Sequence, residues 1–236
     1  MIKNFFPLIL AGGKGTRLES ISKGTPKPLM RINEKFFICY IFEKLILAGF
    51  RRVYISVGYK SDVFQETLGN VYKDLSLVFL EEKKPLGTGG AILNAFKKIK
   101  INHLFVLNGD SICNIDYNEF LNFYSSKMDV LMLTVRINNS LRFGNVEVGE
   151  GNRVLSFSEK TGNTNIINGG IYVLKRQVFD GISDSFFSFE EDILKKKKNN
   201  FYHYFTKKNF LDIGTPESFR YATIQLKKYV FKEKTK

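Results

Sequence analysis

A glycine-rich loop that follows an apolar, strand-like segment constrains this chain more than any other feature. Residues 5–10 are apolar, the run LAGGKGTRL occupies positions 10–18, and PKPL follows at 26–29. Glycine accepts positive φ angles and lets the backbone approach a ligand without a Cβ in the way. Successive N–H groups in such a loop form an anion-binding nest, which Lys14, Arg17 and Lys27 would strengthen. The loop therefore predicts a polyphosphate site at the end of a strand.

Two better-known phosphate loops do not match this run. A P-loop reads G-x-x-x-x-G-K-[ST], a string that the sequence lacks. A dinucleotide fingerprint reads G-x-G-x-x-G, and Leu18 stands where its third glycine belongs. A tight turn that holds no ligand is the remaining alternative, but the cations and the Pro-Lys-Pro that follow favour the phosphate site.

Length and composition indicate a globular protein with a sizeable core. The chain has 236 residues, of which 44% are hydrophobic. No apolar run approaches the roughly 18 residues that a membrane span needs, and no signal-peptide pattern opens the chain. The two cysteines lack CxxC spacing, which argues against a disulfide framework or a zinc site. We expect a cytoplasmic protein without a membrane partner, with one domain over residues 1–225 and a basic tail over 226–236, and the oligomeric state stays open.

The net charge of +13 raises the question of a nucleic-acid partner. The lysines are scattered, with clusters only at 195–198 and 227–236, and such runs are usually solvated helix faces. No RNP-like aromatic motif, zinc finger or helix-turn-helix signature accompanies them. A basic surface also attracts small polyanionic substrates, and we expect these rather than a nucleic acid.

The first half of the chain, about residues 1–115, alternates strand-like and helix-like segments. Strands are predicted at 5–10, 53–57, 77–80 and 104–107, and helices at 37–47, 61–68 and 88–99. Alternation at this spacing predicts an α/β fold with a Rossmann-like, doubly wound, mostly parallel sheet. Ligands bind such sheets beyond the carboxyl ends of the strands, where the glycine loop and Asn108-Gly109-Asp110 both fall.

The second half, about residues 116–225, changes character. Strand-like segments at 130–137, 145–148, 154–158 and 171–174 are joined by turns, which predicts an antiparallel addition to a mixed sheet. Two helices with capping signals follow these strands. Ser188 with Glu191 is typical of a capping box, and Thr215 precedes Pro216 at a first helical position.

Two aspartates that follow strand-like segments suggest a metal site. Asp110 comes directly after Asn108-Gly109, and Asp212 stands before Ile213-Gly214 and a helix start. Carboxylates at such positions can hold a hard cation such as Mg²⁺, although each alone could equally be a turn or capping residue. Two of them beside a cationic glycine loop favour a site for a metal and a nucleotide.

Further segments complete an ordered set of motifs. They are PLGTGGA at 85–91, LNGD at 107–110, Glu159-Lys160, NGGIY at 168–172 and DIGTP at 212–216. With the opening loop, the set closely resembles the motifs of the sugar-1-phosphate nucleotidyltransferases, over about residues 7–220. Among subfamilies, segments 85–91 and 168–172 most resemble bacterial guanylyltransferases that act on D-glycero-D-manno-heptose 1-phosphate. The resemblance implies a GT-A-like nucleotidyltransferase fold with an antiparallel sugar-binding part.

The resemblance also implies a reaction and a role for each matching residue. A sugar phosphate oxygen would attack the α-phosphorus of a nucleoside triphosphate, and pyrophosphate would leave. Arg17 would hold the pyrophosphate and Lys27 the α-phosphate as the catalytic residues, while Asp110 and Asp212 would bind Mg²⁺. The expected nucleotide contacts are Leu10, Ala11, Gly12, Gly13, Gly15, Thr16, Glu82, Pro85, Gly87, Thr88, Asn108 and Gly109. The expected sugar-phosphate contacts are Gly144, Glu159, Lys160, Asn168, Gly169 and Gly170.

Some of these residues have simpler interpretations without the family. Glu159-Lys160 could be an ordinary surface pair, and Gly169-Gly170 could mark a strand bulge. A catalytically inactive relative that binds nucleotide sugars would share the fold, but the intact set of Arg17, Lys27, Asp110 and Asp212 argues against it. A glycosyltransferase usually presents Asp-x-Asp after a strand, and the sequence has no such string.

Glu82 decides the predicted nucleotide. It lies three residues before Pro85, where the resembling enzymes carry a residue that faces the base edge. Guanine presents two adjacent donors, N1–H and the 2-amino group, which a carboxylate accepts together, whereas uracil presents one donor between two acceptors. We therefore expect GTP with D-glycero-D-manno-heptose 1-phosphate. A pyrimidine nucleotide such as UTP with a hexose or amino-sugar 1-phosphate is the alternative, since Glu82 beside Glu81 and Lys83 could be solvated.

Overall fold

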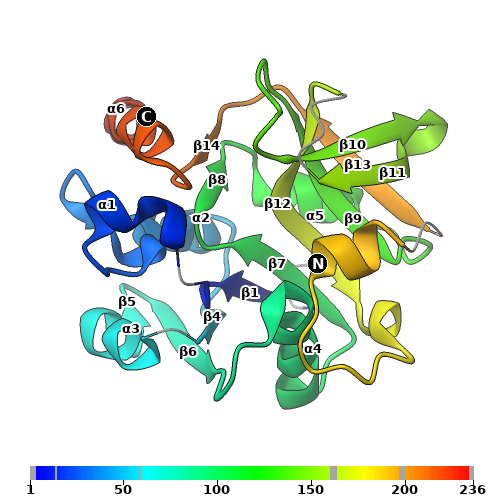
Figure 1. Cartoon of the computed structure of the whole chain (residues 1–236), viewed down its shortest axis with the longest axis horizontal. Helices are drawn as coiled ribbons and strands as arrows, with labels where there is room; N and C mark the ends of the chain where they lie inside the picture. The colour runs from blue at the N-terminus through cyan, green and yellow to red at the C-terminus, as the bar shows by residue number, and fades with distance from the viewer. Residues whose placement is uncertain (1–3, 14, 59, 160–163, 197–199, 234–236) are drawn as a thin grey trace.

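A mixed ten-stranded sheet runs through the molecule (Figure 1). The computed structural model describes residues 4–13, 15–58, 60–159, 164–196 and 200–233, with the backbone alone for Thr16, Glu159 and 228–233. The strands of the sheet are β1 (Phe6–Leu10), β4 (Arg52–Val57), β5 (Val71–Tyr72), β6 (Leu75–Glu81), β7 (His103–Asn108), β9 (Val130–Arg136), β10 (Gly144–Gly149), β11 (Arg153–Glu159), β12 (Ile166–Lys175) and β13 (Phe201–Thr206). Their order is β10-β11-β13-β9-β12-β7-β1-β4-β6-β5.

Helices and short ribbons surround this sheet. The α-helices are α1 (Glu19–Ser22), α2 (Phe37–Leu47), α3 (Ser61–Leu68), α4 (Gly87–Ile99), α5 (Tyr117–Phe123) and α6 (Pro216–Glu233). Shorter helical turns are Thr16–Leu18, Lys27–Leu29, Glu150–Asn152 and Arg176–Phe179, and Phe189–Leu194 forms a π-helix. The two-stranded ribbons pair β2 (Arg31–Ile32) with β3 (Lys35–Phe36), and β8 (Ser111–Cys113) with β14 (Phe210–Asp212).

Strands β7, β1, β4 and β6 form a parallel core with helices on both faces, as the alternating pattern predicts. Successive side chains of a strand point to opposite faces, so both faces of a covered strand must be apolar. Ile9 and Leu107 belong to the apolar cluster that includes residues of α2, α3, α5 and α6. Leu8 and Val106 belong to the cluster that includes α4 and the π-helix. This arrangement confirms the predicted doubly wound α/β fold.

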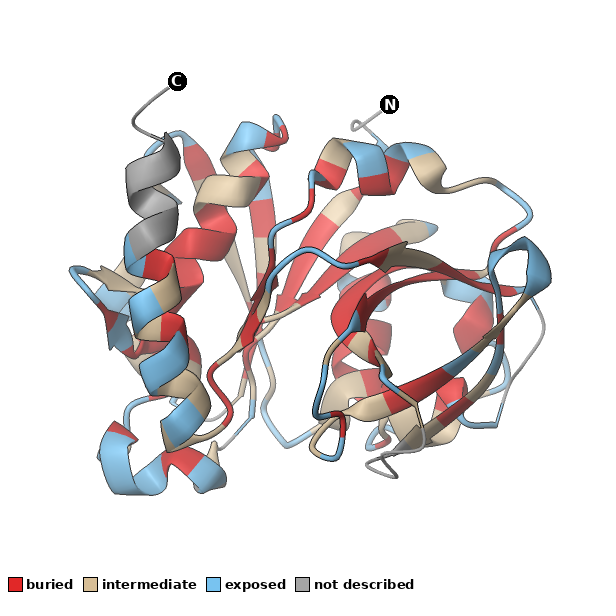
Figure 2. Cartoon of the chain, turned by 90° about the horizontal axis from the view of Figure 1, so that it is seen from above, coloured by how far each residue is buried: buried red, intermediate tan, exposed pale blue. Residues whose placement is uncertain are grey.

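The second half of the sheet curls, and its strand directions correct one expectation. Strand β12 runs antiparallel to β7 and β9, as expected. Strand β10 pairs with β11 and also returns to β12 at Asn145 and Ile167, which gives the curled shape seen in Figure 2. Strand β13, however, lies parallel to β9, so the addition is not purely antiparallel. The helical segment 176–194 carries the chain past β9 before β13 enters the sheet.

The two predicted helix caps are present, one with a different partner. Ser188 Oγ accepts from Glu191 N at 3.2 Å, but the Ser188 N–H donates to Asp192 Oδ2 at 2.9 Å instead of to Glu191. The wider π-helical turn brings the side chain one residue further along over the N-cap. At α6, Thr215 Oγ1 accepts from Ser218 N at 3.3 Å.

The backbone of α6 continues to Glu233. Most of the basic segment expected as a tail, residues 226–236, is therefore a continuation of this helix. Within the described ranges, no helix combines the length and the apolar character that crossing a membrane requires.

Glycines at the start of α4 allow segment 185–189 to lie against this helix. The N–H groups of Gly89 and Gly90 donate to Phe187 O at 3.0 and 3.4 Å. A Cβ on Gly90 would overlap the carbonyl oxygen of Ser185, and one on Gly89 would overlap the Phe187 ring. Phe187 is buried as a result. The close approach fixes how segment 185–189 runs beside the start of α4.

We expect Gly90→Ala to destabilise the protein by about 1–3 kcal/mol, because the new methyl group must displace the backbone of Ser185. A glycine-to-alanine change inside a helix normally stabilises a protein by up to about 1 kcal/mol. A loss of stability in Gly90→Ala would therefore indicate the contact with Ser185. Urea unfolding measures the difference. Lys97→Ala, at an exposed position of the same helix, is the control. Equal or higher stability of Gly90→Ala would show that this contact does not constrain the fold.

Candidate active site

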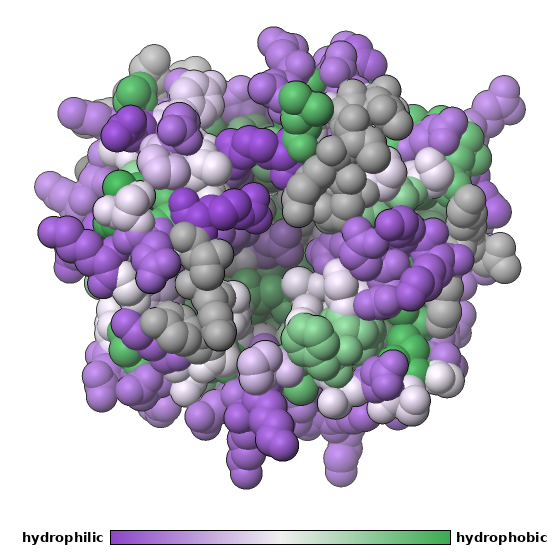
Figure 3. All heavy atoms as spheres, in the orientation of Figure 1, coloured by the Kyte–Doolittle hydropathy of each residue, from purple (hydrophilic) through white to green (hydrophobic). Residues whose placement is uncertain are grey.

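Two cavities meet at the carboxyl end of β7. The first has a volume of about 640 Å³ and is lined by the glycine loop, Glu82 and the start of α4. The second has a volume of about 130 Å³ and lies toward β12 and β14. Asn108 and Asp110 line both. The face in Figure 3 is hollowed near its centre, with hydrophilic side chains above the hollow and apolar ones on its floor.

The glycine loop lies where β1 ends, as the sequence predicts. Ala11 N donates to Ser56 O, and Gly109 N donates to Leu10 O, both at 2.9 Å. A Cβ on Gly109 would stand 2.7 Å from Leu10 O, so only glycine lets β7 end this close to β1. Several of the expected nucleotide contacts line the first cavity here, namely Leu10, Ala11, Gly12, Gly13 and Gly15. Lys14 lies outside the described residues, and Thr16 is described by its backbone alone.

Glu82 lies at the end of β6 and faces the first cavity. Its Oε1 accepts from Ser56 Oγ at 2.9 Å, and its Oε2 accepts from Leu86 N at 3.3 Å. A Cβ on Gly12 would stand 2.9 Å from Oε1, and one on Gly58 would stand 3.4 Å from Oε2. Burial raises the pKa of Glu82 above its ordinary value, although the donors Ser56 and Leu86 act in the opposite direction. The carboxylate is thus fixed in place beside the glycine loop.

The segment 85–91 supplies the far wall of the first cavity, with Pro85, Leu86, Gly87, Thr88 and Ala91. The Thr88 hydroxyl already has protein partners. It donates to Glu190 and accepts from Phe189 N at 2.9 Å. Thr88 therefore joins α4 to the π-helix, and a contact from its hydroxyl to a nucleotide would need a change in these bonds.

Lys27 and Asp110 form an ion pair between the two cavities. Lys27 Nζ lies 3.3 Å from Asp110 Oδ2, and the two side chains are 12% and 40% exposed. Lys27 packs over Gly15, whose φ is +68°, and a Cβ there would stand 3.0 Å from Lys27 Cγ. Pro26 precedes the short helical turn Lys27–Leu29, and Pro28 is its second residue. The Pro-Lys-Pro motif therefore directs a nearly buried cation at the carboxylate of Asp110, two residues after β7.

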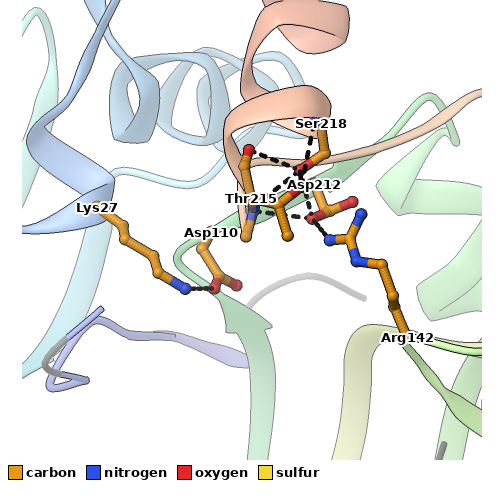
Figure 4. A network of polar contacts seen from close by, with 7 residues as sticks. Lys27, Asp110, Arg142, Asp212, Thr215 and Ser218 are labelled. Carbon is orange, nitrogen blue, oxygen red and sulfur yellow. Dashed lines mark hydrogen bonds and ion pairs between the residues drawn. The ribbon is translucent and has the colours of Figure 1, made fainter. Parts of the chain in front are cut away.

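Asp212 is brought beside Asp110 by the pairing of β14 with β8 (Figure 4). Asp212 lies opposite Ser111 in this ribbon, and Ile213 N donates to Asp110 O at 3.0 Å. Asp212 Oδ2 accepts from Gly214 N, Ser218 Oγ and Arg142 Nη2 at 2.8, 3.0 and 2.9 Å. Both aspartates line the second cavity, so the structure brings together the two carboxylates that the sequence singles out.

These two carboxylates could hold a divalent cation. Among the described residues, no group of three or more His, Cys, Asp or Glu side chains is suitably placed for a metal. A cation between Asp110 and Asp212 would draw its other ligands from water and from substrate phosphates. That coordination is typical of Mg²⁺ in enzymes that act on nucleoside triphosphates.

The expected sugar-phosphate residues divide into two groups. Asn168 and Gly170 line the second cavity. Asn168 Nδ2 donates to Tyr172 Oη at 2.6 Å, and its Oδ1 accepts from Gly170 N at 3.0 Å. Gly170 has a φ of +69° at a register shift between β12 and β9, which is the bulge that its glycines suggest.

The remaining sugar-phosphate residues are not placed on a cavity wall. Gly169 and Gly144 line neither cavity. A Cβ on Gly169 would stand 2.9 Å from Leu133, and one on Gly144 would overlap the Phe157 ring, so close packing explains both glycines. Glu159 pairs with Gly144 through the backbone, and Lys160 lies outside the described residues.

Arg17 is exposed and lines the second cavity, with Asp110 and Asp212, rather than the first. The sequence analysis missed further wall residues, of which Arg142 and Phe186 are the most informative. Arg142 stands in a loop before β10 and carries no motif that would distinguish it from other surface cations. Phe186 lines the first cavity and is 67% exposed. In the sequence it is marked only by the adjacent Phe187 in an otherwise polar segment, which does not predict a ligand contact.

Comparisons with known proteins agree with this geometry. The nucleotidyl transferase family matches residues 6–228. The D-glycero-alpha-D-manno-heptose 1-phosphate guanylyltransferase of Aneurinibacillus thermoaerophilus is 36% identical, over 94% of this chain and 99% of the relative. The enzyme of the same name from Campylobacter jejuni is 39% identical, over 92% and 98%. A mannose-1-phosphate guanylyltransferase from Mycobacterium tuberculosis is 34% identical, over 90% of this chain but 62% of the relative.

Solved structures show the same likeness. The crystal structure of HddC from Yersinia pseudotuberculosis superposes with a TM-score of 0.84 at 37% identity, covering 93% of this chain and 98% of that one. Its complex with GMP-PN superposes with a TM-score of 0.83 at 35% identity and the same coverage. The ordered motifs, the fold and the matched residues lead to one conclusion: the chain belongs to the nucleotidyl transferase family.

Proposed function

We propose that this chain transfers GMP from GTP to D-glycero-D-manno-heptose 1-phosphate, giving a GDP-sugar and pyrophosphate. The observation that carries the choice of GTP is Glu82, a fixed carboxylate in the first cavity beside the glycine loop. Identities of 36% and 39% to two D-glycero-alpha-D-manno-heptose 1-phosphate guanylyltransferases, each over more than nine-tenths of this chain, support the sugar. GTP is a cytoplasmic metabolite, so we place the reaction in the cytoplasm.

Glu82 suits guanine because its acceptor capacity is only partly used. A carboxylate has about four lone-pair directions, and Ser56 and Leu86 occupy two of them. The remaining directions can accept from the N1–H and the 2-amino group of guanine, which are adjacent donors. Uracil would place acceptor oxygens beside the same carboxylate, and this contact is repulsive.

The two cavities suggest how the substrates meet. Residues of the half 1–115 would hold GTP in the first cavity, and residues of the half 116–225 would hold the sugar phosphate near the second. A phosphate oxygen of the sugar would form a bond to the α-phosphorus, and the bond to the β-phosphate oxygen would break as pyrophosphate leaves. Lys27, which lines the first cavity, would neutralise charge at the α-phosphate. Arg17, which lines the second cavity, would hold the pyrophosphate only if that group reaches the place where the two cavities meet. Catalysis would then depend on positioning and charge neutralisation.

Asp110 and Asp212 would hold Mg²⁺ between the two substrates. Bound there, the ion would neutralise phosphate charge and help to orient the reacting groups. The chain's own contribution is to fix the carboxylates. Gly214 and Ser218 hold one oxygen of Asp212, and Lys27 contacts Asp110.

The proposal predicts turnover of GTP with the heptose 1-phosphate in a matrix of nucleoside triphosphates and sugar 1-phosphates, read by pyrophosphate release. We expect kcat/KM for GTP to exceed that for UTP by roughly 5- to 150-fold, as for the loss of a bidentate base contact. In Glu82→Gln this preference should shrink, whereas Glu34→Gln, at an exposed position, should keep it. A wild-type preference for UTP, or one that is unchanged in Glu82→Gln, would refute the assignment of Glu82.

The difference in stability between Glu82→Gln and wild type should change with pH in a predictable direction. Because the pKa of Glu82 is raised above the usual 4.5 by burial, its contribution to the free energy of unfolding is lost as pH rises through the folded-state pKa. Glutamine does not ionise. The melting temperature of Glu82→Gln minus that of wild type should therefore be more positive at pH 8 than at pH 4. A difference that does not change with pH would mean that this carboxyl is well solvated.

Asp110→Asn and Asp212→Asn should each lower kcat by at least about 100-fold at saturating Mg²⁺, because each weakens a metal ligand. Both should melt within a few degrees of wild type. In Asp212→Asn an amide oxygen can still accept the bonds that Gly214 and Ser218 donate, and in Asp110→Asn the lost partner is a single ion pair with Lys27 at a 40% exposed carboxylate. Mn²⁺ binding, followed by electron paramagnetic resonance, should weaken in both variants. Asp62→Asn, an exposed position on α3, is the control. A variant that keeps a tenth of wild-type kcat would exclude its residue from the metal site.

A further inference from the structure

Arg142 has donors that the described residues do not use. Its Nη2 donates to Asp212 Oδ2 at 2.9 Å, and its guanidinium carbon lies 5.3 Å from the centroid of the Phe143 ring. Its Nε is buried and has no hydrogen-bond partner among the described residues. A guanidinium carries five N–H donors in a planar fork, and a buried N–H without an acceptor is unfavourable. Nε therefore lacks an acceptor among the described residues, and the side chain, which is 38% exposed, has further donors within reach of a molecule that enters from solvent.

Asp212 does not depend on Arg142 for its orientation. The oxygen that Arg142 contacts also accepts from Gly214 N and Ser218 Oγ at 2.8 and 3.0 Å (Figure 4). Those two donors lie in the turn and the first turn of α6 that follow Asp212, so local structure already fixes the carboxylate. A role limited to holding Asp212 would leave the rest of the fork unexplained.

The position and charge of Arg142 indicate what the missing acceptor is. Arg142 lines the second cavity with Asn168 and Gly170 of β12, whereas Glu82 and most of the glycine loop line the first. A cavity of about 130 Å³ can admit a group of the size of a phosphate, and arginine binds phosphate through two parallel N–H bonds. Lys27, which lines the first cavity, is available to the nucleotide phosphates.

We propose that Arg142 binds the phosphate of the sugar 1-phosphate while one of its nitrogens stays on Asp212. This inference rests on the proposed function for the identity of the substrate. The arginine would bind both the phosphate of the sugar 1-phosphate and the carboxylate of Asp212. The attacking phosphate oxygen would then lie at a fixed distance from the proposed metal site. Arg142 is then a substrate-binding residue that the motifs of the sequence do not include.

The test compares Arg142→Met and Arg142→Lys with wild type by steady-state kinetics, with each substrate varied in turn. We expect Arg142→Met to raise KM for the sugar 1-phosphate by roughly 10- to 100-fold, as for a lost charge-assisted hydrogen bond. KM for GTP and the Kd for Mn²⁺ should stay within about threefold of wild type, because Gly214 and Ser218 still hold Asp212. Arg142→Lys should fall between the two, since one ammonium cannot reproduce the planar fork.

Arg51→Met is the matched control, because Arg51 forms an exposed ion pair with Asp74 away from both cavities. It should leave both KM values unchanged. Equal increases in both KM values, or a weakened Mn²⁺ Kd in Arg142→Met, would show that Arg142 only positions Asp212. An unchanged KM for the sugar 1-phosphate would also overturn the inference.

If the proposed function is wrong, the kinetic result will differ from one in which only the role of Arg142 is wrong. Wild type would then turn over another substrate pair, and the same comparison would be made with that pair. If wild type turns over none, calorimetric titration with mannose 1-phosphate replaces the kinetics. Binding that is equal in wild type and Arg142→Met, or absent from both, would overturn the role of Arg142.

Discussion

The close approach of Asp110 and Asp212 is the constraint on which the rest of the site depends. Two carboxylates in one small cavity repel each other, and a fold that brings them together must offset this charge. Here Lys27 contacts Asp110, and Arg142 contacts Asp212. The ribbon of β8 and β14 supplies the geometry, because it fixes Asp212 opposite Ser111 through backbone pairing. The two nearby cations therefore offset the repulsion between the carboxylates, and the register of β14 against β8 sets the position of Asp212.

The sequence predicts the parallel half of the fold well because its signals are local. Leu8 and Ile9 are adjacent apolar residues that face opposite sides of the sheet, and such runs occur where helices cover both faces. The glycine loop and Asp110 are also local signals, since each stands directly after its strand. The curled half was harder to predict. The parallel pairing of β13 with β9 depends on how segment 176–194 crosses the sheet, which no short window of sequence encodes.

The candidate site shows the same division between local and tertiary information. Asp212 could be singled out because a strand precedes it and a capped helix follows. Arg142 could not, because its significance arises only when the loop before β10 meets the turn after β14. Gly169 and Gly144 show the converse. Gly169 belongs to the NGGIY motif, and both glycines were expected at the sugar phosphate, but the structure packs Gly169 against Leu133 and Gly144 against Phe157.

The pairing of each carboxylate with a cation also bears on how substrates enter. Under the proposed function, anionic phosphates and a divalent cation would arrive together beside Lys27 and Arg142. A phosphate that approaches either cation compensates positive charge, and a metal ion that approaches either aspartate compensates negative charge. Entry of only one of them would leave charge uncompensated in a partly desolvated cavity, which is costly. If the proposed function holds, the metal ion and the phosphates would therefore bind together, and the ion pairs Lys27–Asp110 and Arg142–Asp212 would compensate the charges of these four side chains until then.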